Sequence, residues 1–285
     1  MPEGPEIRRE ALSLAEVLIG ETLVRADYRV PRLARRARTL RGKLVVGVVS
    51  RGKALLVAYS NGLTHYSHNQ LYGRWRVVPL AALAGLLDER AASIRVVLET
   101  RANAAVLLSA TQIDLLTARE LAGQPYLARL GPDVLDPSTT VAAVEARLRD
   151  PAFSRRSLAS LLLDQHFLAG LGNYLRSDIL HATGLRHAVR PADLDAGAIT
   201  RLARATLALP RQSLRTGGTT NDLQTVRRLR SQGVTPGARR FRVYGREGLP
   251  CWTCRTRVRR KDVGGRAIYF CSRCQPDQSV RTPAK

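Results

Sequence analysis

The chain begins MPEGPEIRREALSLAEVLIG (residues 1–20), and this stretch sets the arrangement of the domain that follows it. Its apolar residues recur at helical spacing and predict a helix over residues 5–19, which Gly20 ends. From residue 22 the period changes to two, as in a half-buried strand, and we expect further strands at residues 43–50, 53–59, 62–67, 73–78, 94–100 and 104–109. A single helix ahead of many short strands predicts a β-sandwich of two sheets.

The first residues also supply a candidate nucleophile. Removal of Met1, which a small second residue such as proline permits, would leave Pro2 with a secondary amine at the N-terminus. The pKa of an α-amino group is about 8, so part of it is unprotonated at neutral pH and can add to an aldehyde to form an iminium. Glu3 and Glu6 lie beside this amine and could transfer protons. The same residues also suit an ordinary helix start, with Pro5 and an acid in the first turn.

The composition indicates a polyanionic partner. The 285 residues carry a formal net charge of +23 with a pI near 11.3, which favours nucleic acid over an anionic membrane surface. We find no apolar run near the roughly 20 residues of a membrane span, and no signal-peptide pattern. All four cysteines lie within residues 251–274, which argues against a disulfide-stapled secreted protein. We therefore expect a cytoplasmic protein, associated with the nucleoid when it is bound to DNA.

Two short stretches between the expected strands stand out. Lysine occurs only four times against forty-two arginines, and a lysine can lose its proton whereas arginine effectively cannot. One of the four, Lys53, lies in the turn of residues 50–53, which would present it at the end of a sheet. We expect residues 67–73, SHNQLYG, to form an exposed loop, in which Leu71 and Tyr72 are either core residues or wedges for a partner.

The second half of the chain predicts helices and a small module. We expect a connector over residues 117–150, a helical block over about 139–210, and a basic, glycine-rich linker over 213–240. Within the block, Gly170-Leu171-Gly172 precedes a helix that starts near Asn173. Backbone N–H groups at such a helix start can bind phosphate, although tight packing between helices also explains the glycines.

The cysteines have the spacing of a four-thiolate zinc site. Cys251-x2-Cys254 and Cys271-x2-Cys274 are separated by sixteen residues, which leaves room for a β-hairpin. Four thiolates fill the zinc tetrahedron, so we expect one structural Zn²⁺ and no catalytic cofactor. Two disulfides are the alternative. Arg266, after two glycines, should lie at the hairpin tip of this basic region.

Five separated stretches together resemble the Fpg/Nei DNA glycosylases, and within them endonuclease VIII: MPEGPEIRR, RGKALL, SHNQLYG, LDQHFLAGLGNYLR and the zinc module. The resemblance runs in the same order from end to end. It implies a multidomain α+β protein, with DNA in the cleft between two lobes. The expected parts are an N-terminal catalytic helix-plus-sandwich domain (1–125), a connector (126–138), a helix–two-turn–helix domain (139–235), a zinc finger (241–275) and a probably disordered tail (276–285).

The resemblance also implies catalytic roles. Pro2 would attack C1′ of the damaged nucleotide, Glu3 would donate a proton that helps to open the sugar, and Glu6 would support the site. Lys53 would contact the phosphate beside the lesion and serve in β-elimination, and Arg266 would do the same for δ-elimination.

The implied DNA contacts form two groups. Residues that would fill the gap left by a flipped-out base are Gln70, Leu71 and Tyr72. Residues that would contact phosphate are Gly170, Gly172 and Asn173, and Arg129 matches another DNA contact of the family.

The resemblance therefore predicts a monomeric, bifunctional DNA glycosylase and AP lyase that acts on damaged double-stranded DNA, with no membrane partner. The Gln-Leu-Tyr wedge favours oxidised pyrimidines, with Fpg-like oxidised-purine specificity as the alternative. A non-catalytic zinc-ribbon DNA-binding protein is the alternative from another class, although it leaves the joint presence of Pro2, Glu3, Lys53 and the wedge unexplained.

Overall fold

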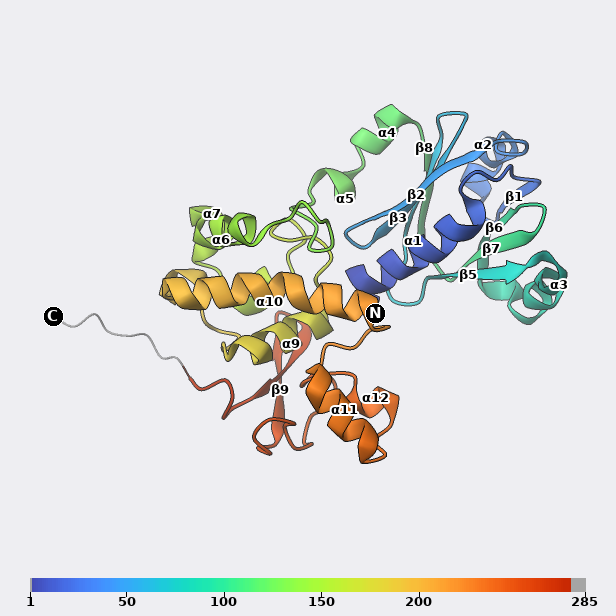
Figure 1. Cartoon of the computed structure of the whole chain (residues 1–285). Helices are drawn as coiled ribbons and strands as arrows, with labels where there is room; N and C mark the ends of the chain where they lie inside the picture. The colour runs from blue at the N-terminus through green and yellow to red at the C-terminus, as the bar shows by residue number, and fades with distance from the viewer. Residues whose placement is uncertain (1, 278–285) are drawn as a thin grey trace. The chain divides into compact units, whose positions relative to one another are not determined.

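The computed structural model describes residues 2–277, and the chain divides into two compact units, residues 1–129 and 130–285 (Figure 1). We predict disorder for the C-terminal tail, residues 276–285. From residue 278 onward this prediction lies outside the described residues. Among residues 2–277, no helix is long and apolar enough to cross a membrane.

The first unit is a sandwich of two four-stranded antiparallel sheets. One sheet has the order β1 (Arg25–Tyr28), β6 (Ile94–Glu99), β7 (Asn103–Leu108), β5 (Arg74–Pro79). The other has the order β2 (Val45–Arg51), β3 (Ala54–Tyr59), β4 (Thr64–His68), β8 (Gln112–Leu116). Every strand that the two-residue period predicted is present. Strand β8 was not predicted.

Helix α1 (Gly4–Leu18) packs along this sandwich and confirms the predicted N-terminal helix. It contacts β2 and β3 of one sheet and β5 of the other. Its buried residues Ile7, Ala11, Leu14 and Leu18 join the same core cluster as the inward-facing side chains of both sheets. The apolar stripe of α1 therefore fixes the helix, and with it the N-terminus, against both layers.

Short helices that the sequence did not predict cover the outer faces. Helix α3 (Leu80–Glu89) places Leu83 and Leu86 on the outer face of the first sheet. Helices α4 (Ala118–Ala122) and α5 (Pro125–Ala128) pack Tyr126 and Leu127 on the outer face of the second. The remaining elements are η1 (Pro31–Leu33), α2 (Ala34–Arg38) and η2 (Ala91–Ser93).

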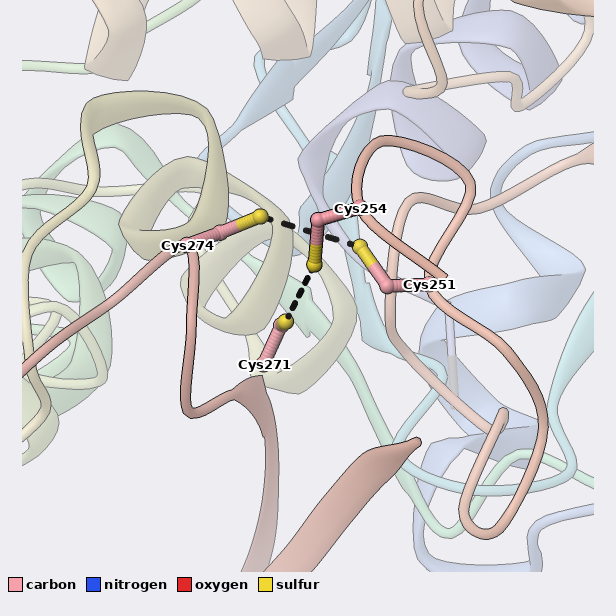
Figure 2. A group of neighbouring side chains, drawn as sticks. All are labelled: Cys251, Cys254, Cys271 and Cys274. Atoms are coloured by element: carbon pink, nitrogen blue, oxygen red, sulfur yellow. Dashed lines mark hydrogen bonds between the residues drawn. The ribbon is translucent and has the colours of Figure 1, made fainter. Parts of the chain in front are cut away.

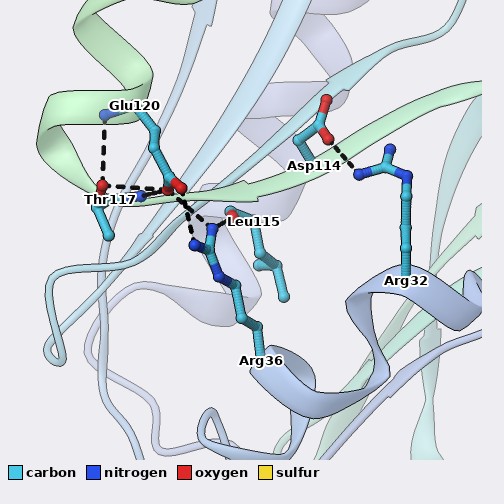
Figure 3. A network of polar contacts seen from close by, with 6 residues as sticks. All are labelled: Arg32, Arg36, Asp114, Leu115, Thr117 and Glu120. Atoms are coloured by element: carbon cyan, nitrogen blue, oxygen red, sulfur yellow. Dashed lines mark hydrogen bonds and ion pairs between the residues drawn. The ribbon is translucent and has the colours of Figure 1, made fainter.

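An exposed polar network joins α2 to the edge strand β8 and the start of α4 (Figure 3). Arg36 donates to both carboxylate oxygens of Glu120, at 2.7 and 2.8 Å, and to the carbonyl of Leu115 at 2.7 Å. Arg32 donates to Asp114 at 2.6 Å. The guanidinium of Arg36 lowers the pKa of Glu120 to about 2. Because these groups are exposed, their ion pairs add little to the free energy of unfolding. Their main effect is to orient α2.

The second unit is built on helices packed around one apolar core. Its helices are α6 (Val141–Arg149), α7 (Pro151–Ser154), α8 (Leu158–Leu161), α9 (Asn173–Thr183), η3 (Pro191–Asp193) and α10 (Ala196–Arg215). Helix α8, the turns of residues 162–172 and helix α9 form the expected helix–two-turn–helix, and α9 packs on α10.

The expectation of an irregular linker over residues 213–240 is wrong. Helix α11 (Leu223–Ser231) and helix α12 (Pro236–Arg239) occupy this stretch. The side chain of Asp222 accepts a hydrogen bond from Thr225 N and so caps α11, and Leu229 is buried. The other faces of α11 carry many arginines, so the sequence does not clearly indicate the one residue that this helix buries, Leu229.

A buried carboxylate joins α9 to the segment before the cysteines. Asp178 accepts hydrogen bonds from the backbone N–H groups of Arg242, Val243 and Tyr244 at 2.9, 3.0 and 3.1 Å. The hydroxyl of Thr220 donates to the same carboxylate. Such charge-assisted bonds fix the path of this segment, whose Phe241 and Tyr244 side chains also pack against the helical core.

The last regular element is the hairpin of β9 (Val258–Val263) and β10 (Arg266–Cys271), which lies between the two cysteine pairs as predicted. Gly264 and Gly265, with φ of 59° and 74°, form its two-residue turn. Positive φ at both turn positions suits the right-handed twist of the strands and explains two glycines in succession.

Candidate active site and metal centre

The N-terminal residues lie at the start of α1. Glu3 is 3 % exposed, and its backbone N–H donates to Glu6 Oε2 at 3.1 Å. This bond fixes the Glu6 carboxylate beside the first turn, where the helix dipole favours negative charge. The ordinary helix start and the proposed amine site are therefore the same piece of structure, and one does not exclude the other.

A surface pocket of about 520 Å³ opens beside Pro2. It brings together residues from the start of α1, the loop after β4 and the ends of β5 and β7, namely Pro2, Glu6, Glu10, Leu71, Tyr72, Gly73, Arg74, Arg90, Ser93, Leu108 and Ser109. The structure thus places the expected nucleophile and Glu6 in one pocket with two residues of the expected wedge.

The loop of residues 69–73 is a tight turn with exposed apolar side chains. Leu71 is 57 % and Tyr72 is 78 % exposed, so the alternative that they belong to the core is wrong. Gln70 has φ of 49°, and its side chain accepts a hydrogen bond from Thr111 at 2.8 Å. A Cβ at Gly73 would lie 2.6 Å from the carbonyl oxygen of Asn69, so this position requires glycine.

Lys53 lies in the turn between β2 and β3, at the end of the sheet as predicted. Its backbone N–H donates to the Tyr126 hydroxyl at 2.9 Å, and the Tyr126 ring packs edge-on against His68 with centroids 4.9 Å apart. Burial, and then the charge of Lys53, lowers the pKa of His68. The lowered pKa favours the neutral form of the histidine beside Lys53.

The glycine turn before α9 is held by a glutamine. Gly170 N donates to Gln165 Oε1 at 3.1 Å, and Gln165 Nε2 donates to the carbonyl of Leu171 at 2.9 Å. Gly172 is the N-cap residue of α9, which begins at Asn173. The amide of Gly170 is thus already hydrogen-bonded within the protein, whereas the start of α9 presents the amides expected to meet phosphate.

The side chain of Asn173 contacts the zinc-module hairpin. It donates to the carbonyl of Ala267 at 2.8 Å, and Arg176 donates to the same carbonyl at 3.1 Å. The neighbouring Arg266 is exposed at the hairpin tip, as predicted. These bonds therefore hold Asn173 close to the start of strand β10, where Arg266 lies, and both residues belong to the second unit. Arg129 is exposed at the end of α5 in the first unit.

Glu10 is a site residue that the sequence analysis missed. The half-buried Glu10 accepts hydrogen bonds at Oε2 from Asn69 Nδ2 at 2.7 Å and from Trp75 N at 3.3 Å. Burial raises the pKa of Glu10 to about 7, although its two hydrogen bonds oppose the rise. Its spacing of seven residues from Glu3 and four from Glu6 puts all three on one face of α1, which was the available signal.

The four cysteines converge (Figure 2). Their sulfur atoms all lie within 4.8 Å of one another, with Cys251–Cys274 at 3.8 Å and Cys254–Cys271 at 3.3 Å. Sulfurs that share a tetrahedral zinc at the usual bond length lie about 3.8 Å apart. All four are free, so the disulfide alternative is wrong, and the donor set fits one structural zinc.

Helix α9 also contacts this centre. His181 Nε2 lies 3.4 Å from Cys251 Sγ, so an N–H at this position would donate to a thiolate. Such a bond orients a metal ligand and stabilises its charge. The zinc module is thereby joined to the helical core at its metal centre as well as at its hairpin.

Known proteins similar to this chain share its full length. Residues 1–114 match the family described as "Formamidopyrimidine-DNA glycosylase N-terminal domain". Endonuclease 8 of Klebsiella pneumoniae subsp. pneumoniae is 43 % identical over 275 residues, which cover 96 % of this chain and 100 % of that protein. Endonuclease 8 of Escherichia coli K12 is 42 % identical over 275 residues, which again cover 96 % of this chain and 100 % of that protein. This chain belongs to the endonuclease 8 family.

Members of this family are DNA N-glycosylases with AP lyase activity in base excision repair, and the chain is an enzyme of this class. A solved structure of Lactococcus lactis Fpg in complex with abasic-site DNA has a TM-score of 0.78 at 20 % identity, covering 96 % of this chain and 99 % of that one. This likeness confirms the fold expected from the resemblance. The zinc centre and the absence of a catalytic cofactor agree with the family.

The raised pKa of Glu10 predicts a pH-dependent stability. The unfolded carboxyl ionises near pH 4.5 and the folded one near 7, so stability is fully present below pH 4.5 and falls as the pH rises to 7. Glu10→Gln removes this charge. Relative to wild type, the variant should gain about 2 kcal/mol of unfolding free energy at pH 8 and little at pH 5, after allowance for solvent screening.

Urea unfolding at both pH values measures this difference. Glu16→Gln, the same change at an exposed position of α1, is the matched control and should change stability equally at the two pH values. An equal gain at pH 5 and pH 8 for Glu10→Gln would contradict the assigned titration.

The zinc centre predicts the effect of losing one ligand. Cys254→Ser should release zinc and weaken DNA binding, because the hairpin that carries Arg266 has too small a core to stay folded without metal. Zinc content and DNA affinity measure the two effects. Ser272→Ala, between the ligands Cys271 and Cys274, should change neither. Full DNA affinity in a zinc-free variant would contradict the structural role.

Proposed function

We propose that this enzyme excises oxidised bases, mainly pyrimidines, from double-stranded DNA through a Schiff base on Pro2, and then cleaves the strand by β,δ-elimination. The observation that carries this proposal is the pocket lined by Pro2, Glu6, Leu71 and Tyr72. A nucleophile for C1′ and side chains that could replace an extruded base belong to one site, as chemistry on a flipped nucleotide requires.

The first step forms the covalent intermediate. The neutral Pro2 nitrogen attacks C1′ and the bond from C1′ to the base breaks. The base leaves with the electron pair of that bond and takes up the N–H proton that the Pro2 nitrogen loses. Glu3 donates a proton to the sugar ring oxygen as the ring opens, which leaves the iminium. The Glu6 carboxylate, bonded to the Glu3 amide, keeps this first turn in place.

The iminium then allows strand cleavage. The iminium makes the C2′ proton more acidic. Loss of this proton expels the 3′ phosphate in β-elimination, and a second elimination then expels the 5′ phosphate. Water finally hydrolyses the iminium and restores the Pro2 amine. Lys53 serves the first elimination and Arg266 the second, each by holding the phosphate that leaves.

We assign the remaining DNA contacts to the residues that the family resemblance implies. Gln70, Leu71 and Tyr72 fill the space left by the extruded base. The N-terminus of α9, with the amides of Gly172 and Asn173, binds phosphate, while the Gly170 amide, which donates to Gln165, supports this turn. Arg129, in the first unit, makes a separate contact with DNA.

The preference for pyrimidines rests on the wedge and on the identity of 42–43 % to proteins named Endonuclease 8. Oxidised purines are the competing substrate class, and release of thymine glycol and 8-oxoguanine from matched duplexes distinguishes them. We further propose a monomeric cytoplasmic enzyme with domain boundaries at residues 1–125, 126–138, 139–235 and 241–275.

Blocking the N-terminus should abolish the chemistry. Untagged protein with Met1 removed should form a covalent complex with an abasic-site duplex in borohydride, because borohydride reduces the iminium to a stable amine. A variant with a residue added before Pro2 should lose at least about 100-fold in trapping, since it has no free amine. DNA affinity is the control and should change little. Trapping that persists would remove Pro2 from its role.

Lys53 should promote strand cleavage by contacting one phosphate. Lys53→Ala should lower single-turnover strand cleavage about 10- to 100-fold, the effect of one charge-assisted hydrogen bond. The slope of log affinity against log salt should fall by about one. Lys43→Ala removes the same charge elsewhere in the first unit and should leave cleavage unchanged. Equal losses in the two variants would show that Lys53 contributes only net charge.

A further inference from the structure

Glu10 joins the helix that carries Pro2 to the loop that carries Leu71 and Tyr72. Glu10 lies two turns after Glu3, on the face of α1 that lines the pocket. Its carboxylate contacts Asn69, the first residue of the loop, and Trp75, which follows the loop in β5. One oxygen atom, Oε2, accepts both hydrogen bonds and so holds the beginning of the loop next to the strand that leaves it.

The loop has a conformation that requires such an anchor. Gln70 has a positive φ of 49°, which is unfavourable for a residue with a side chain. Gly73 N donates back to the carbonyl of Asn69 at 2.8 Å, which closes the turn on itself. Asn69, the residue that Glu10 binds, is only 1 % exposed although its neighbours Leu71 and Tyr72 are largely exposed. The buried base of the loop therefore determines where its exposed tip lies.

We propose that Glu10 is a positioning residue that holds the loop of residues 69–73, so that Leu71 and Tyr72 are fixed beside Pro2 when a base leaves the stack. This inference rests on the proposed function. Glu10 does not touch the reacting atoms. It acts through Asn69 and the backbone of Trp75, and it sets the distance between the nucleophile and the side chains that replace the base.

The role should be strongest when a base must be extruded. Removing a paired base from a duplex costs stacking and pairing energy, which a well-placed wedge offsets. At a preformed abasic site there is no base to extrude, so less depends on the position of the loop. Loss of Glu10 should therefore slow base release more than it slows cleavage at an abasic site.

Ionisation of Glu10 should modulate this role. The charged groups around it are Glu6 on the same helix, Arg74 at the start of β5, and Arg9 and Arg90, which line the pockets on either side. His65 packs against the Trp75 ring, but burial lowers its pKa to about 3, so it stays neutral near pH 7. Burial makes the Glu10 charge costly for the fold, yet the ionised carboxylate accepts the two loop hydrogen bonds more strongly.

The experiment compares two rates in one duplex under single-turnover conditions. Thymine glycol release reports base extrusion, and strand cleavage at an abasic site in the same position reports the lyase step alone. Glu10→Ala should lower the first rate about 10-fold and the second less than about twofold. Glu10→Gln keeps an acceptor oxygen and should recover most of the loss. Between pH 6 and 8, the ratio of the two rates should rise for wild type and stay flat for Glu10→Gln.

Controls and failures are separable. Asn69→Ala should reproduce the defect of Glu10→Ala, and the double variant should be no worse than either single one, because the two residues act as one unit. Glu16→Gln should behave as wild type. Equal losses of both rates in Glu10→Ala, or no loss, would overturn the positioning role. Absence of cleavage and borohydride trapping by wild type at the abasic site would instead overturn the proposed function.

Discussion

The packing of helix α1 between the two sheets is the constraint on which the first unit depends. Ile7, Ala11, Leu14 and Leu18 are each at most 2 % exposed. Burial of an apolar side chain contributes about 1.5–3 kcal/mol, so the rotation of α1 about its axis is firmly set. Because the apolar face is fixed, the adjacent edge of the helix, with Glu3, Glu6 and Glu10, is fixed as well. The position of an N-terminal amine, usually the least ordered group of a chain, thereby follows from core packing.

Sequence reasoning recovered the parts of the fold that local signals specify. The helix of residues 5–19, seven of the strands and the hairpin between the cysteine pairs each follow from a period or a spacing. Strand β8 and helix α3 were missed because each is short and lacks a clear period. Helix α11 was missed because it buries little more than Leu229 and is otherwise rich in arginine, which resembles a solvated linker. Such elements depend on contacts with distant parts of the chain.

The candidate site shows the same division. Pro2, Glu3, Lys53 and the cysteines stand in short stretches whose chemistry can be read from neighbouring residues. The spacing of Glu10 places it on the same face of the helix as Glu3 and Glu6, but its neighbours in the sequence do not show what it contacts. Its importance arises from Asn69, which is 59 residues away in the chain. A residue whose role is to join two elements becomes recognisable only when the elements are placed together.

The zinc module illustrates how metal and protein divide the task of placing Arg266. The metal closes the module, but its attachment comes from one face of helix α9. Asn173 and Arg176 hold the carbonyl of Ala267, Asp178 holds the amides of residues 242–244, and His181 meets Cys251. These contacts run from the hairpin to the thiolates, so they orient the module while zinc supplies its internal stability. The start of the same helix carries the amides expected to bind phosphate, so the bonds from Asn173 and Arg176 to Ala267 hold the backbone next to Arg266 close to that helix start.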